Sequence, residues 1–180
     1  MFKNQLTHYG LISILIHWLT VIIVSGLAIL GLWMVDLDYY SEWYKTGPEI
    51  HRSVGVLFAM LLLFRMVWRF WSPPPGSLES HQPWERKSAR IVHWILLLLM
   101  WAVIVAGYLI STADDRGIDV FGWFVVPATL TSIPDQEDLA GDIHFYLAMT
   151  LLALAFLHGL AALKHHFIDH DGTLVRMFGR

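Results

Sequence analysis

The sequence predicts an all-α, polytopic membrane protein: a four-helix transmembrane bundle with both termini in the cytoplasm. Of the 180 residues, 56% are hydrophobic and only 15% are charged, well below the charged share of a soluble domain. Four apolar runs are each long enough to cross a hydrocarbon core as a helix, which takes about 20 residues. Basic and acidic residues separate to opposite ends of these runs. The length suits a single domain, residues 1–180.

The apolar runs place helices at residues 11–35, 54–71, 91–111 and 143–163. The first run is too long for a signal-peptide core and has no small-residue cleavage site after it, so we expect it to be retained. Pro48 suits the first turn of the second helix, and the prolines at 73–75 end that helix. In the long link after residue 111, the apolar stretch 121–127 is expected to lie back on the bundle.

The distribution of charge predicts the orientation, because lysine and arginine concentrate on the cytoplasmic side of short loops. Eleven of the fifteen acidic residues fall on one side of the predicted bundle and nine of the twelve basic residues on the other. The side that holds the basic residues and both termini is therefore expected to be cytoplasmic. Its basic residues are Lys3, Arg65, Arg69, Arg86, Lys87, Arg90, Lys164, Arg176 and Arg180.

Histidine is the main supply of metal ligands in this chain. Cysteine is absent, which excludes disulfides, thiolate zinc sites, iron–sulfur clusters and covalently attached haem. Ten histidines remain, and neutral imidazole binds haem iron, zinc and copper alike. No basic run suggests nucleic acid as a partner.

Four of these histidines fall at two levels of the predicted bundle. His144 and His158 are fourteen residues apart, so they share a helix face at a separation of about 21 Å along the axis. His17 lies about 9 Å in from the cytoplasmic side, level with His158, and His51 lies near the outer boundary, level with His144. Ionisable side chains inside an apolar span usually face the bundle interior and carry a function. The levels predict two axial sites for haem iron, His17/His158 and His51/His144.

Other residues of the spans admit a structural interpretation. His93 is expected to be interfacial, because only the pair His165/His166 is expected near its level on the fourth span. Arg65 and Arg69 suit haem propionates, but snorkelling to the headgroups explains them equally well. The glycines that follow or adjoin two of the predicted ligands, Gly55 and Gly159, leave room for a macrocycle or for helix contact.

Several motifs along the chain resemble the bacterial cytochrome b561 family. They are Y-G-x-x-S-x-x-x-H-W-L around His17, E-x-H-x-S-x-G around His51, G-x-x-H at His144, and L-H-G-x-x-A-L-K-H-H-F from Leu157 to Phe167. The resemblance covers essentially the whole length and implies a four-helix membrane cytochrome with two haem b, each held by two histidines. It further implies electron transfer between a periplasmic one-electron partner and the quinone pool, with ubiquinone near the cytoplasmic haem. Some members oxidise superoxide at the periplasmic haem.

Two alternatives remain open from the sequence. The chain could be the cytochrome b anchor of a hydrogenase or dehydrogenase complex, or a transporter that uses the same histidines for zinc or copper. The acidic outer side also disfavours superoxide as a substrate, because a surface that steers an anion should be positive. A basic or neutral donor, such as a periplasmic protein or a soluble quinol, fits that charge better.

Overall fold

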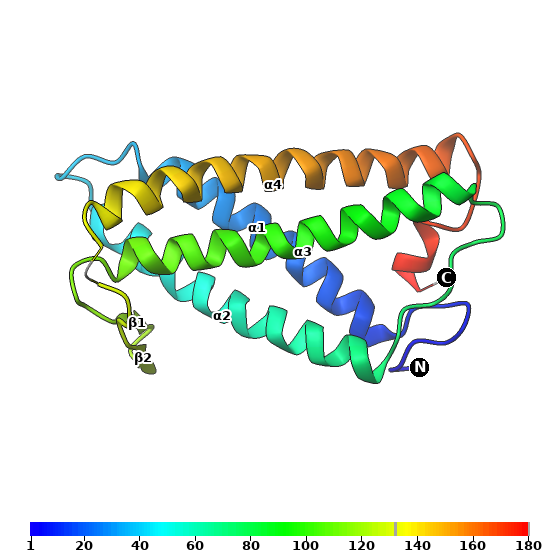
Figure 1. Ribbon diagram of the computed structural model, residues 1–180, viewed down its shortest axis with the longest axis horizontal. Helices are drawn as coiled ribbons and strands as arrows, with labels where there is room; N and C mark the ends of the chain where they lie inside the picture. Colours follow the sequence, from blue (N-terminus) through cyan, green and yellow to red (C-terminus); the bar gives the residue numbers. More distant parts are fainter. Residues whose placement is uncertain (132, 180) are drawn as a thin grey trace.

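Four long helices form the protein. The computed structural model describes residues 1–131 and 133–179. Its helices are α1 (Leu11–Met34), α2 (Trp43–Trp71), α3 (Pro83–Ser111) and α4 (Gln136–Phe167), and each is long and apolar enough to cross a membrane. They run along the long axis of the molecule, and the first and last described residues lie at the same end (Figure 1). The predicted four-helix membrane bundle is confirmed.

Three of the helices begin earlier than the apolar runs suggest. α2, α3 and α4 start at residues 43, 83 and 136, because polar first turns extend each helix beyond its lipid-sized core. At α3, Pro83 occupies the first turn and the Glu85 carboxylate accepts the Gln82 backbone N–H at 2.9 Å, which satisfies a terminal donor. Pro48 is therefore inside α2, and its predicted place in the first turn is wrong.

The middle of the bundle is filled by a central apolar layer, which we define as Phe58, Leu62, Met100 and Leu151. These four side chains are buried, and Leu62 is 0% exposed. Leu151 lies seven residues from both His144 and His158 along α4. The layer therefore separates the two predicted histidine levels, about 10 Å from each.

A small hairpin covers one end of the bundle. Its strands, β1 (Ile118–Val120) and β2 (Phe124–Val126), pair antiparallel, and β1 packs against α2. Val120 is fully buried, and the Ser53 hydroxyl donates to the Asp119 carbonyl at 3.2 Å. The apolar stretch 121–127 was expected to make this contact, but Trp123 and Val125 are 72% and 60% exposed. The expectation is met only at the end of the stretch, where the Tyr108 hydroxyl of α3 donates to the Pro127 carbonyl at 2.8 Å. The strand before the stretch makes the buried contact with the bundle.

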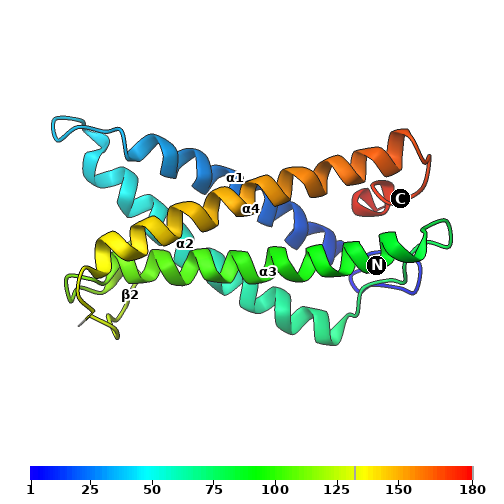
Figure 2. The same ribbon diagram turned by 45° about the horizontal axis from the view of Figure 1, so that its top comes forward.

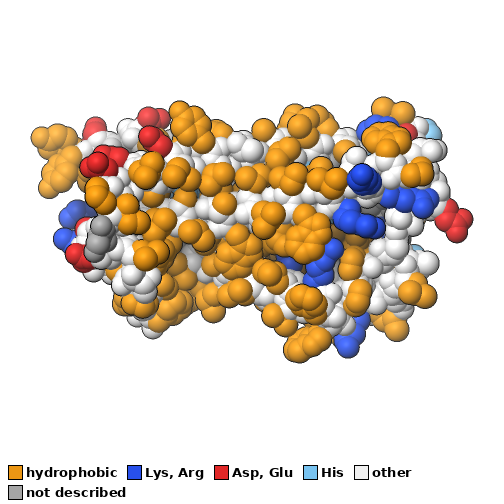
Figure 3. Space-filling model, in the orientation of Figure 1, with side chains coloured by type: hydrophobic (Ala, Val, Ile, Leu, Met, Phe, Trp, Pro, Cys, Tyr) orange, Lys and Arg blue, Asp and Glu red, His pale blue; other side chains and the backbone are white. Residues whose placement is uncertain are grey.

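The two ends of the molecule carry opposite charge (Figure 3). We call the end with the hairpin the acidic end. Thirteen acidic residues lie between positions 36 and 142; Glu79 and Glu85 belong to the other end, and the remaining eleven are exposed at the acidic end. We call the other the basic end, where most lysines and arginines lie. Arg180 lies outside the described residues. The tail turns back onto the basic end as the short helix η1 (Val175–Phe178) (Figure 2), and the Trp18 indole N–H donates to the Met177 carbonyl at 2.8 Å.

Candidate functional site

At the acidic end, His51 of α2 faces His144 of α4. Their ring centroids are 6.2 Å apart and the ring planes are inclined by 70°. Both side chains are partly buried. The structure therefore brings together the two histidines that the sequence places at the outer level, although they are 93 residues apart in the chain.

The hydrogen bonds of this pair leave ring nitrogens free. His144 Nδ1 lies 2.9 Å from the Val103 carbonyl oxygen of α3. A carbonyl oxygen only accepts, so Nδ1 carries the hydrogen and Nε2 carries the lone pair that a metal needs. His51 Nδ1 is buried and has no hydrogen-bond partner among the described residues. A metal-ligating histidine typically donates one ring N–H to a backbone carbonyl and binds the metal through the other ring nitrogen.

Each imidazole of the outer pair rests against a glycine of a neighbouring helix. A Cβ atom at Gly31 of α1 would lie 3.2 Å from His51 Cε1, and one at Gly107 of α3 would lie 3.1 Å from His144 Cε1. Both distances are tighter than ordinary van der Waals contact. By contrast, a Cβ at Gly55 or Gly159 would meet no atom within 4 Å. Gly31 and Gly107 therefore make room for the two imidazole rings. Gly55 and Gly159 instead border open space.

A second group of histidines lies toward the basic end. His17 of α1 is close enough to Arg65, His158 and His93 to feel their charges. The ring centroids of His93 and His158 are 5.1 Å apart. The expectation that His93 has no partner at its level on α4 other than His165/His166 is wrong.

The register of α3 against α4 explains this contact. Fourteen residues separate His93 from Gly107 on α3, and fourteen separate His144 from His158 on α4. Because the helices are antiparallel and Gly107 meets His144, His93 falls level with His158. That register was not readable from the sequence, where the start of α3 was placed eight residues too late.

The arginines near this group differ in environment. Arg65 Nη1 donates to the Thr20 hydroxyl of α1 at 3.3 Å, so its guanidinium turns into the bundle rather than toward the end of α2. Arg69 lies over the Trp94 ring of α3, 5.6 Å from its centroid, a cation–π arrangement. Arg65 is close enough to act electrostatically on His17, His93 and His158, whereas Arg69 acts on His93.

Two levels of imidazole, separated by an apolar layer, suit a protein that holds two redox groups. Imidazole can ligate iron without cysteine, and each level offers at least two rings. The spacing of the outer pair fits one metal ion between the rings, because two imidazoles bound at about 2 Å on opposite sides put their centroids on the order of 6 Å apart. The ligand roles of His17, His51, His144 and His158 remain predictions.

Comparison with known proteins gives a family. Residues 8–180 match the family model described as prokaryotic cytochrome b561. The chain is 53% identical over 179 residues to Cytochrome b561 homolog 2 of Escherichia coli (strain K12), covering 99% of this chain and 95% of that protein. It is 29% identical over 173 residues to the Probable superoxide oxidase CybB of Yersinia pestis, covering 94% of each. Cytochrome b561 homolog 1 of E. coli is 26% identical over 171 residues, covering 93% of this chain and 95% of that protein.

Proposed function

Because this chain belongs to the prokaryotic cytochrome b561 family, whose members are membrane electron-transfer proteins that bind haem b, we propose that it holds two haem b and passes single electrons between them. His51 and His144 hold one at the acidic end, and His17 and His158 hold the other toward the basic end. The chain is a multi-pass protein of the bacterial inner membrane, and its charges favour an orientation with the basic end in the cytoplasm.

The geometry of the outer pair carries this proposal. The centroid separation of 6.2 Å fits two axial imidazoles, and the bond to the Val103 carbonyl fixes the tautomer of His144 that can ligate. Gly55, four residues after His51, offers open space on the same helix. With His51 and His144 both holding the iron, no open position would remain on it for oxygen.

Haem b would supply the one-electron carrier, and the protein would exclude water and provide charge around it. The central apolar layer keeps water out of the space between the two levels. Arg65 places a positive charge beside His17 and His158, suited to a carboxylate such as a haem propionate. Electrons then pass between a one-electron donor at the periplasmic, acidic end and the quinone pool, with ubiquinone as the partner near the inner histidines.

Superoxide is a second candidate donor, because one relative is named a probable superoxide oxidase. The charge of this chain opposes that reaction. The links of the acidic end carry eleven acidic residues and only Lys45, Arg52 and Arg116 as bases, so an anion is repelled at low ionic strength. A basic protein or a neutral quinol remains the better match for this surface.

Haem counting tests the ligand assignment. Purified protein should show two haem b per chain by a reduced-minus-oxidised spectrum and pyridine haemochrome quantification. His51→Ala and His144→Ala should each lose the outer haem, and His17→Ala and His158→Ala the inner one. His8→Ala is the matched control, because the His8 side chain is exposed and its hydrogen-bond partner among the described residues is the neighbouring Thr7. Full occupancy in any of the four variants would remove that residue from the ligand set.

A kinetic comparison tests the donor. Haem reduction should be faster with a basic one-electron donor than with superoxide, and lowering the ionic strength should widen the difference. Turnover by the purified chain alone, with ubiquinone as acceptor, would separate an independent oxidoreductase from an anchor subunit that needs a partner. Superoxide-driven quinone reduction that rises at low ionic strength would contradict the proposed preference.

A further inference from the structure

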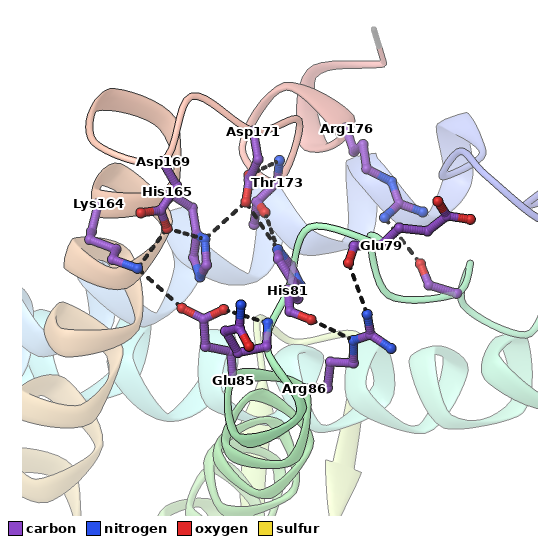
Figure 4. Close-up of polar contacts among 12 residues, drawn as sticks. Glu79, His81, Glu85, Arg86, Lys164, His165, Asp169, Asp171, Thr173 and Arg176 are labelled. Carbon is purple, nitrogen blue, oxygen red and sulfur yellow. Dashed lines mark hydrogen bonds and ion pairs between the residues drawn. The ribbon is translucent and has the colours of Figure 1, made fainter.

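Figure 4 shows a separate cluster of metal-ligating side chains, which includes none of the four proposed haem ligands. It joins His81 from the link before α3, His165 near the end of α4, and Asp171 from the tail. Asp171 Oδ2 lies 3.1 Å from His81 Nε2 and 3.0 Å from His165 Nδ1. The two imidazole centroids are 4.7 Å apart.

The three residues can each offer one ligand atom to a shared ion. One such atom from each of His81, His165 and Asp171 lies within 4.8 Å of the others. Ligands of a tetrahedral zinc ion, each at about 2 Å, are on the order of 3.3 Å apart, close to the two measured contacts. Two imidazoles and one carboxylate are a set that zinc binds with a fourth position left for water.

The cluster is enclosed rather than a solvated surface group. The side chains of His81, His165 and Asp171 are 13%, 14% and 7% exposed. Asp171 Oδ2 lies within hydrogen-bond distance of His81 Nε2 and His165 Nδ1, and its Oδ1 accepts the Thr173 backbone N–H at 2.8 Å. A divalent ion would take the place of the imidazole protons between these atoms, because metal binding releases protons from its ligands. No lysine or arginine among the described residues lies within ion-pair distance of Asp171.

A neighbouring group of similar residues is less suited to a metal. Glu85, His165 and Asp169 also lie close together. The Lys164 ammonium, however, already bridges Glu85 at 3.1 Å and Asp169 at 2.6 Å. Its positive charge satisfies both carboxylates and repels a divalent ion. The cation site therefore centres on Asp171.

We propose that His81, His165 and Asp171 bind one divalent transition-metal ion of the zinc class, which fastens the tail to α4 and to the link before α3. The Thr173 hydroxyl lies 2.9 Å from His81 Nε2, the nitrogen that would bind the metal, so this hydrogen bond gives way when the ion binds. The tail then continues to Met177 and Phe178, which contact Trp18 beside His17. Metal binding at this site would hold the tail against Trp18, whose ring packs edge-on against His17.

Zinc titration of the haem-containing protein tests the site. After treatment with a chelator, the wild-type protein should bind one Zn²⁺ per chain in the presence of excess Mg²⁺, measured by calorimetry and by elemental zinc-to-iron ratio. His81→Ala and the isosteric Asp171→Asn should each weaken binding by about tenfold or more. His170→Asn is the matched control, because His170 is exposed, adjoins Asp171, and has a left-handed backbone that asparagine tolerates.

Two results would overturn the proposal. One is equal zinc affinity in wild type, His81→Ala and Asp171→Asn, with an unchanged haem spectrum confirming that each variant is folded. The other is zinc binding that does not slow hydrogen exchange in residues 171–178, because a metal held by Asp171 must order the tail. In the wild type the exchange should slow on adding Zn²⁺, and in Asp171→Asn it should not.

Discussion

The outer pair of histidines depends on glycines that are not themselves ligands. Gly107 lies against the His144 ring and Gly31 against the His51 ring. A Cβ atom at either position would lie closer to an imidazole carbon than ordinary van der Waals contact allows. The space for each ring is therefore made by the residue opposite it on a neighbouring helix.

Gly107→Ala should disturb the outer haem. The added methyl would lie 3.1 Å from His144 Cε1 and 3.2 Å from Nδ1, so the ring must shift and strain its bond to the Val103 carbonyl. We expect lower occupancy or a changed midpoint potential of one haem, measured by redox titration with optical detection. Gly26→Ala is the control, since a Cβ there meets nothing within 4 Å and alanine favours a helix by about 1 kcal/mol. Equal spectra for both variants would mean that Gly107 does not position His144.

His93→Ala should keep both haems. His93 lies beside His158 and is exposed, whereas His17 is partly buried. We therefore expect His17→Ala to lose the inner haem and His93→Ala only to shift its potential, because the second removes a neighbour rather than a ligand. Loss of haem from His93→Ala, with retention in His17→Ala, would assign the inner site to His93 and His158.

Sequence reasoning at this scale identified the residue types but not all their partners. The levels of His51 and His144 follow from helix rise alone, because each lies near a recognisable helix boundary. Gly107 was missed and His93 was assigned to the interface, since their contacts depend on how α3 is rotated and shifted against α4. The His81, His165 and Asp171 cluster was missed for the same kind of reason: 90 residues separate His81 from Asp171, and no periodicity links a loop to a tail.

The hairpin is an element held by one buried strand. Val120 is 0% exposed and Ile118 is 5% exposed, whereas Val125 of the paired strand is 60% exposed. The sequence marked the more apolar stretch 121–127 as the packed one. Hydrophobicity alone could not separate the two, because alternation in a three-residue strand is too short to show which face is buried.

Val120→Ala should loosen the hairpin without affecting haem content. Removing two buried methyl groups costs on the order of 1 to 2 kcal/mol of local stability. We expect faster hydrogen exchange in residues 118–126, followed by mass spectrometry, and an unchanged haem spectrum. Val125→Ala removes the same atoms from an exposed position and should leave exchange near the wild-type rate. Similar rates in the two variants would show that β1 is not what holds the hairpin on α2.

At the scale of the whole molecule, composition and charge predicted most of the architecture. Four spans, one bundle and both described ends of the chain at one end all follow from apolar run length and an even number of crossings. The polar first turns of α2, α3 and α4 were not predicted, since a hydropathy pattern marks only the apolar part of each helix.

The absence of cysteine allows a direct test of orientation. Single cysteines in place of exposed Glu137 at the acidic end and exposed Lys87 at the basic end give two labelling sites on a clean background. In intact spheroplasts, a membrane-impermeant maleimide should label Glu137→Cys at once and Lys87→Cys only after permeabilisation, because the basic end is expected to face the cytoplasm. The reverse pattern would invert the assignment of the two haem sites to the two sides.

The layer of Phe58, Leu62, Met100 and Leu151 has a consequence for bioenergetics. A file of water molecules needs polar partners at each step, and these four buried apolar side chains offer none. Protons consumed when a quinone is reduced must then come from the aqueous phase on the quinone's own side. Electrons, but not protons, would then cross the apolar layer. Each turnover would therefore move charge across part of the membrane, and its rate would depend on the membrane potential.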